Sequence, residues 1–199
     1  MTTDNTILLL GCGILEKEIT YLIKKNGWQL KTHFLDSSLH VNFDKLSKTL
    51  TAALKKEQGR NIIVFYGCCH PLMDKILEDA GTFRTVGQNC VDILLGYELF
   101  FEELSNGAFF LLEEWAVRWN QIMKTFKNRE ILREIFQGDR KYLLCIRTAC
   151  SDDFTAESEK VSDMVGLPVR WIDVSLDHLE SVIQDAITKK IEILSQKRR

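Results

Sequence analysis

The sequence predicts an α/β fold, namely a single three-layer Rossmann-like or flavodoxin-like domain over residues 1–199. Its sheet is expected to be mostly parallel, with about five to six strands and helices on both faces. Two observations lead to this prediction. Short apolar runs alternate with longer segments of helical period, and no repeat, low-complexity linker or break in composition divides the chain. A chain of this length can also bury a substantial core without disulfides or a structural metal.

The first part of the chain predicts three strands, at residues 6–10, 30–35 and 62–66, each followed by a helix. Gly27 ends the first helix and Gly59 lies near the end of the second. The third strand is an unbroken apolar run, which is typical of a strand buried on both faces. A third helix is expected over residues 72–79. We predict the flavodoxin-like order, in which the first strand lies between the second and the third.

The rest of the chain continues the alternation. After a short apolar run at 83–86, Asn89 is a candidate N-cap for a helix that begins at Cys90 and ends before Gly96. Three further strands and three helices are then expected. The strands are 108–112, 142–146 and 169–174, and the helices are 116–136, 155–165 and a last one whose apolar stripe runs from Leu179 to Leu194.

Composition and charge exclude several classes of function. Lys plus Arg total 26 against 28 Asp plus Glu, so the formal charge of -2 creates no field that would attract nucleic acid. No segment reaches the roughly 18 apolar residues of a membrane span, and the N-terminus lacks the pattern of a signal peptide. We therefore predict a cytoplasmic protein that binds neither nucleic acid nor membrane.

The six cysteines are the main candidates for chemistry, because a reducing compartment disfavours structural disulfides. In open α/β sheets, ligands bind beyond the carboxyl ends of the strands. Cys12 follows the first strand, Cys69 follows the third, and Cys90 begins a helix. Helix N-termini favour thiolate over thiol, so lowered pKa values are expected at Cys69 and Cys90. We predict that Cys12, Cys69 and Cys90 hold a metal centre with an open position, an iron–sulfur cluster ahead of zinc.

Neighbouring polar residues have possible supporting roles. His70 is a candidate fourth ligand or catalytic proton-transfer group, with helix capping as the alternative. The amides of Gln88 and Asn89 are candidate cofactor-binding groups that hydrogen-bond the sulfurs, although amides beside glycine often only make a turn. Among the other cysteines, Cys145 and Cys68 are interpreted as apolar core residues. Cys150 either borders the site or lies in a solvated loop.

A competing interpretation starts from Gly11-x-Gly13, which follows a strand and opens a helix as a dinucleotide-binding loop does. Asp36, at the end of the second strand, could meet ribose hydroxyls. Glu16 occupies the third glycine position, where a large acid opposes helix packing and repels pyrophosphate. Nucleotide or S-adenosylmethionine binding by the Gly11–Gly13 loop is therefore a lesser alternative.

Four short, ordered motifs resemble an uncharacterised bacterial and archaeal family known as domain of unknown function one-six-three-eight. They are Gly11-Cys12-Gly13 with Glu18, Tyr66-Gly67-x-Cys69-His70-Pro71, Gln88-Asn89-Cys90 with Leu94-Leu95-Gly96, and Phe110 through Trp115. The resemblance spans 8–174. The resemblance implies that members of the family have cysteine at the positions of Cys12, Cys69 and Cys90, and that the residue at the position of Cys68 varies. Members often occur near corrinoid-dependent methyltransferase genes in anaerobes, which implies a setting in one-carbon or corrinoid metabolism.

Together these observations predict a metal-binding cysteine-site protein that acts on a small molecule or a corrinoid-linked group. The alternative from another class is a non-catalytic accessory partner of corrinoid methyltransferases, which would use the same cysteines for metal handling or redox sensing. The partner in the two cases is a small-molecule substrate or a corrinoid protein.

Overall fold

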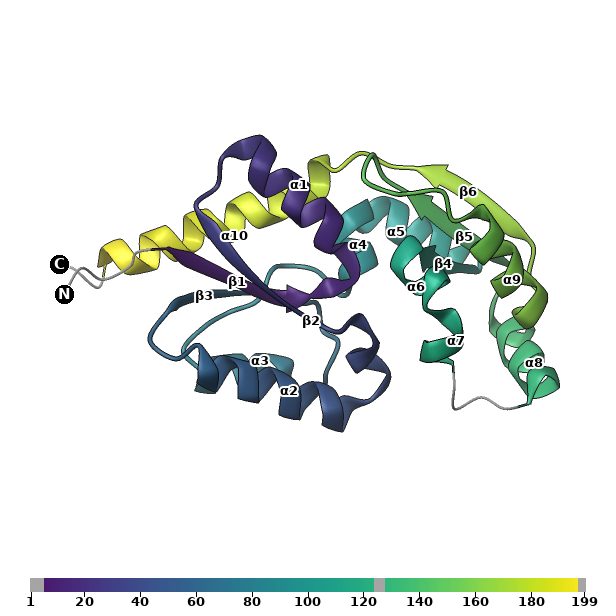
Figure 1. Ribbon diagram of the computed structural model, residues 1–199, viewed down its shortest axis with the longest axis horizontal. Coiled ribbons are helices and arrows are strands. Elements are labelled where there is room, and N and C mark those ends of the chain that lie inside the picture. The colour runs from purple at the N-terminus through teal and green to yellow at the C-terminus, as the bar shows by residue number, and fades with distance from the viewer. Residues whose placement is uncertain (1–5, 124–127, 197–199) are drawn as a thin grey trace. The chain divides into compact units, whose positions relative to one another are not determined.

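The computed structural model describes residues 6–123 and 128–196. The chain divides into two compact units, which are described separately (Figure 1). The first comprises Met1–Leu94 together with Asp177–Arg199, and the second comprises Leu95–Leu176. A single domain over 1–199 stays a prediction. Among the described residues, no helix is long and apolar enough to cross a membrane.

The first unit contains a parallel three-stranded sheet in the order β2-β1-β3, which confirms the predicted position of the first strand. Its strands are β1 (Ile7–Cys12), β2 (Leu30–Leu35) and β3 (Asn61–Phe65). Every residue of β1 is buried, as expected for the central strand. Gly11 lies opposite Phe65, where a side chain would come within 2.6 Å of the Phe65 Cβ, so only glycine fits between these two strands.

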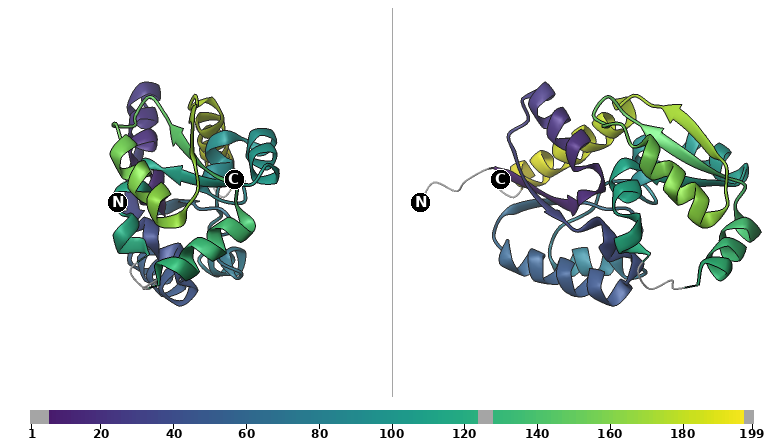
Figure 2. Two further views of the ribbon diagram at one scale, coloured as in Figure 1. Left: turned by 90° about the vertical axis from the view of Figure 1, so that its right-hand side faces the viewer. Right: turned by 45° about the vertical axis from the view of Figure 1, so that its right-hand side comes forward.

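Helices cover both faces of this first sheet. In Figures 1 and 2, α1 (Glu16–Asn26) and α10 (Asp177–Gln196) lie on one face, and α2 (Phe43–Lys56) and α3 (Met73–Asp79) lie on the other. This arrangement follows from two right-handed crossovers that run in opposite directions across the sheet, from β1 to β2 and then from β2 past β1 to β3. A left-handed Gly27 ends α1, and Asn42 caps α2 by accepting a hydrogen bond from the Lys45 N–H at 2.9 Å. The short elements η1 (Gly13–Leu15) and η2 (Ser37–Val41) also belong to the first unit, as does α4 (Cys90–Leu95) up to Leu94.

The second unit contains another parallel three-stranded sheet, in the order β4-β5-β6. Its strands are β4 (Ala108–Leu112), β5 (Tyr142–Arg147) and β6 (Val169–Asp173). Because each strand is added beside the previous one, α8 (Arg129–Asp139) and α9 (Thr155–Val165) pack together on one face. The core on that face includes Phe136, Cys145 and Phe154. The other helices are α5 (Tyr97–Ser105), α6 (Glu113–Val117) and α7 (Trp119–Ile122).

The structure corrects two predictions. One sheet of five to six strands is wrong, because the six strands of the described residues form two sheets of three. The free edge of β3 is covered by the short run after α3: Val64 pairs with Arg84, and the Val64 N–H donates to the Phe83 carbonyl at 3.0 Å. The helix predicted over 116–136 is also interrupted. Arg118 leaves helical geometry between α6 and α7, and Asn128 caps a new helix, while 124–127 lie outside the described residues.

Candidate functional site

Three cysteines from separate segments of the first unit meet at the carboxyl edge of its sheet. Cys12 is the last residue of β1, Cys69 lies in the loop that follows β3, and Cys90 is the first residue of α4. Because β1 and β3 are hydrogen-bonded neighbours, their carboxyl ends lie side by side. Cys12 and Cys90 are buried, with 3% and 8% of their surface exposed, and Cys69 is partly buried.

Gly67 allows the loop that carries Cys69 to contact the loop that carries Cys90. A Cβ atom at Gly67 would lie 2.3 Å from the carbonyl oxygen of Gln88 and 2.5 Å from the Cα of Asn89. The Cys68 N–H donates to the same Gln88 carbonyl at 2.7 Å. Since these neighbours are backbone atoms that cannot turn aside, the absence of a side chain at Gly67 sets the spacing of the two loops.

Asn89 fixes the start of α4 and so the position of Cys90. Its side-chain oxygen accepts hydrogen bonds from the N–H groups of Val91 at 2.9 Å and Asp92 at 3.0 Å, which confirms the predicted N-cap. The buried Asp92 carboxylate accepts in return from the Gln88 N–H at 2.6 Å. This reciprocal arrangement resembles a capping box, and it satisfies backbone donors that would otherwise be buried without partners.

The three thiols interact with one another through Cys90. The side chains of Cys12 and Cys69 both act on the Cys90 thiol, and together with burial they raise the pKa of Cys90 well above the ordinary value. The pKa of Cys69 is shifted in the opposite direction. The hydrogen bond from Cys90, a second from the Gly67 backbone and the positive charge of Arg84 outweigh burial and lower the pKa of Cys69 to about 7. The pKa of Cys69 is lowered as expected, but through these neighbours and not through a helix N-terminus, since α3 begins only at Met73. The lowered pKa expected at Cys90 is wrong, because the neighbouring thiols and burial oppose it.

Tyr66 adds a polar group that the site prediction missed. Only 1% of its surface is exposed, and its hydroxyl has no hydrogen-bond partner in the part of the chain that the structure describes. Burial raises the pKa of Tyr66, and so do the charges of Cys12, Cys90 and Cys69. The phenol therefore lies in the same buried region as the three thiols. The only sequence signal for a role of Tyr66 at the site was its position as a polar residue at the end of an apolar predicted strand.

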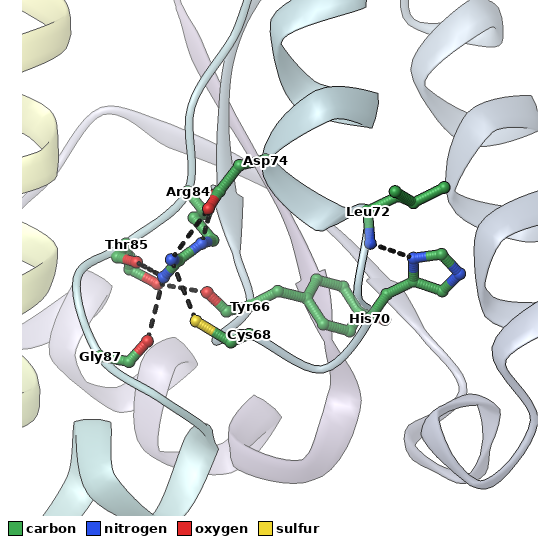
Figure 3. A network of polar contacts seen from close by, with 8 residues as sticks. All are labelled: Tyr66, Cys68, His70, Leu72, Asp74, Arg84, Thr85 and Gly87. Carbon is green, nitrogen blue, oxygen red and sulfur yellow. Dashed lines mark hydrogen bonds and ion pairs between the residues drawn. The ribbon is translucent and has the colours of Figure 1, made fainter.

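Arg84 is the second site residue that sequence analysis missed. Its guanidinium donates to Asp74 at 2.7 Å, to the carbonyls of Thr85 and Gly87, and to the Cys68 sulfur at 3.1 Å (Figure 3). The Arg84 side chain is only 18% exposed. One side chain thus joins α3, the loop after β3 and the loop that leads to Cys90. A lone arginine in a short apolar run gives no hint of this role.

The predicted supporting residues mainly hold local structure. The Nδ1 atom of His70 accepts the Leu72 N–H at 2.9 Å, in the turn before α3 begins at Met73 (Figure 3). The His70 ring packs edge-on against Phe43. Gln88 is exposed and joins the two loops through its backbone. The side-chain oxygen of Asn89 is used by the helix cap. Catalysis by His70 and cofactor binding by Gln88 and Asn89 stay predictions.

The other cysteines have different surroundings from Cys12, Cys69 and Cys90. Cys145 is fully buried in β5, where burial raises the pKa of its thiol to about 11, so its interpretation as a core residue is confirmed. The same interpretation is wrong for Cys68, which is exposed and contacts Arg84 instead of the core. Cys150 lies in the second unit, in a turn where its N–H donates to the Thr148 hydroxyl at 3.1 Å.

The glycines that suggested a nucleotide loop have a structural role. A side chain at Gly11 would clash with Phe65, and one at Gly13 would come within 3.1 Å of the Leu35 carbonyl oxygen. The Asp36 carboxylate accepts hydrogen bonds from the backbone and the hydroxyl of Ser38, at 2.8 and 2.6 Å. Strand packing and a capped turn therefore account for the residue types that resemble a dinucleotide-binding motif.

The donor set suits a soft metal, although it is not arranged as a closed cage. Thiolate ligands are those that zinc and iron–sulfur clusters prefer. Within residues 6–123 and 128–196, no group of three or more His, Cys, Asp or Glu side chains is spaced to hold a metal ion as it stands. Binding by all three sulfurs would require the thiol side chains to turn toward a common point.

Comparison with known proteins gives a family match and no activity. A family model described as "Protein of unknown function (DUF1638)" matches residues 34–183. No curated protein matches the chain. Among solved structures, a protein from Xanthomonas campestris pv. campestris, described as a "putative hydrolase of the alpha/beta superfamily", aligns over 97% of this chain and 99% of its own. The identity is 8% and the TM-score 0.29, so this likeness carries no argument about function.

Proposed function

Because the chain belongs to the DUF1638 family, whose function is unknown, we propose its function from the site alone: a metal centre bound by Cys12, Cys69 and Cys90. The observation that carries the proposal is the meeting of three thiols from three segments, with Cys90 in contact with the other two. Thiolate ligands suit an iron–sulfur cluster or zinc, and three of them would leave a further position for an exogenous ligand.

Each residue around the thiols has a definite part in this proposal. Cys69 is the first thiolate ligand available, since its pKa of about 7 makes deprotonation easy at neutral pH. Cys90, whose pKa is raised, loses its proton only as the metal binds, and that proton is released to solvent. For the substrate we propose a small molecule or a corrinoid-linked group, and the support for the latter is the family resemblance.

The test is metal analysis of protein purified without oxygen. Iron, acid-labile sulfide and zinc are measured in the wild type, in Cys12→Ala, Cys69→Ala and Cys90→Ala, and in the control Cys68→Ala, which removes the neighbouring exposed thiol. We expect bound metal in the wild type and the control, and loss of metal in the other three variants. A metal-free wild type, or full metal in the three variants, would overturn the proposal.

Thiol redox chemistry is the second candidate, and it also suits an accessory protein. The observation that favours it is the interaction of Cys69, whose pKa is lowered, with Cys90, whose pKa is raised. A peroxide could oxidise this pair to a disulfide, with loss of two protons and two electrons from the thiols and formation of water. Rapid formation of a Cys69–Cys90 disulfide in metal-free protein, found by mass spectrometry of peptides, would support this candidate. Failure of peroxide to form it would exclude it.

A further inference from the structure

The contacts of the described residues do not explain why a hydroxyl group is present at Tyr66, beside the three thiols. The Tyr66 side chain is almost completely buried, yet its O–H has no partner among the described residues. A buried donor without a partner costs free energy, and native structures rarely keep one unless water or a ligand completes it. Phenylalanine would fill the same space at no such cost.

The surroundings of Tyr66 indicate where the missing partner lies. Tyr66 lies one position beyond the Gly11–Phe65 pair, which places it beside Cys12 at the carboxyl ends of β1 and β3. The next residue, Gly67, is where the loops that carry Cys69 and Cys90 meet. The phenol and the three thiols therefore lie at the same edge of the first sheet, in agreement with the influence of these cysteines on the pKa of Tyr66. The backbone of Tyr66 is held separately, since its carbonyl accepts from the Thr85 hydroxyl at 3.3 Å (Figure 3). The hydroxyl, which has no partner among the described residues, is available to a molecule that enters the thiol site.

The chemistry of a phenol restricts what that molecule can be. An ordinary tyrosine pKa is about 10 and burial raises it, so the hydroxyl keeps its proton at neutral pH and acts as a donor. Its partner must present a hydrogen-bond acceptor, namely a lone pair on oxygen or nitrogen. We propose, on the basis of the proposed metal centre, that Tyr66 donates a hydrogen bond to a small acceptor ligand bound beside Cys12, Cys69 and Cys90.

Two measurements on Tyr66→Phe test this. The matched control is Tyr142→Phe, because the Tyr142 hydroxyl has a partner: it donates to Glu103 at 2.6 Å. In metal-free protein, we expect Tyr66→Phe to melt at the same temperature as the wild type or higher, and Tyr142→Phe to melt lower. A melting temperature below that of the wild type in Tyr66→Phe would show that the hydroxyl serves the fold, and would overturn the proposal.

The second measurement uses protein loaded with Co²⁺, which replaces zinc in thiolate sites and absorbs visible light, and azide as the acceptor ligand. The dissociation constant of azide is measured from the visible spectrum. We expect Tyr66→Phe to bind Co²⁺ as the wild type does and to bind azide about tenfold or more weakly, with no change in Tyr142→Phe. Equal azide affinity in Tyr66→Phe and the wild type would overturn the inference alone. Absence of sulfur-to-cobalt charge transfer in the wild type would overturn the metal centre and this inference together.

Discussion

Replacement of Gly67 by alanine tests whether the close contact of two loops builds the site. The new Cβ would lie 2.3 Å from the Gln88 carbonyl oxygen, 2.4 Å from its carbon and 2.5 Å from the Asn89 Cα. Ordinary contact begins near 3.4 Å, so the loops must separate by about 1 Å. Overpacking of this kind costs about 1–3 kcal/mol. Loss of the hydrogen bond from Cys68 to Gln88 adds about 1 kcal/mol.

We therefore expect Gly67→Ala to lower the free energy of unfolding by about 2–4 kcal/mol, measured by urea denaturation of the metal-free protein. The separation also moves Cys69 away from Cys90, so metal affinity should fall as well. Gly138→Ala is the matched control, because Gly138 lies in α8 and a Cβ there meets nothing within 4 Å. Alanine at Gly138 should stabilise the helix by about 0.5–1 kcal/mol. Equal stability and equal metal content in Gly67→Ala and the wild type would refute the reasoning.

Three further predictions concern the same loops. The rate of Cys69 alkylation in metal-free protein should rise with pH and reach half its maximum at about 7, because the thiolate is the reactive form; a midpoint near the ordinary cysteine value would contradict the contact with Cys90. Arg84→Gln should move that midpoint upward, since it removes the positive charge that favours the thiolate, and an unchanged midpoint would count against this role of Arg84. Asn89→Ala and Asn42→Ala each remove a helix cap and should each lower the free energy of unfolding by about 1 kcal/mol, but only Asn89→Ala should weaken metal binding. Equal metal affinity in both variants would show that the α4 cap does not position Cys90.

Much of the first unit could be predicted because its signals are local. Apolar runs with glycine after them located β1 and β3, and the order β2-β1-β3 brought Cys12 close to the loop of Cys69. Asn89 before an apolar stripe identified the start of α4, since an N-cap depends only on a side chain and the backbone two or three residues ahead. Such features need no knowledge of distant parts of the chain.

The single large sheet could not be rejected from the sequence. Six strand-like runs are equally compatible with one sheet or with two. The decision depends on what pairs with the outer edge of β3, and the structure shows that residues near Arg84 do so. This pairing joins residues about twenty positions apart through backbone hydrogen bonds, which are the same for almost any side chain. The strands that follow then form a sheet of their own.

The sequence by itself determined the α/β class, the helix caps and the cysteines that follow strand ends, because period, capping and strand-end position are properties of short segments. Only the tertiary structure decided how the thiols differ. The pKa of Cys69 falls and that of Cys90 rises because each depends on burial and on neighbours from other segments. The same holds for Tyr66 and Arg84, whose roles arise from which atoms surround them and not from any pattern along the chain.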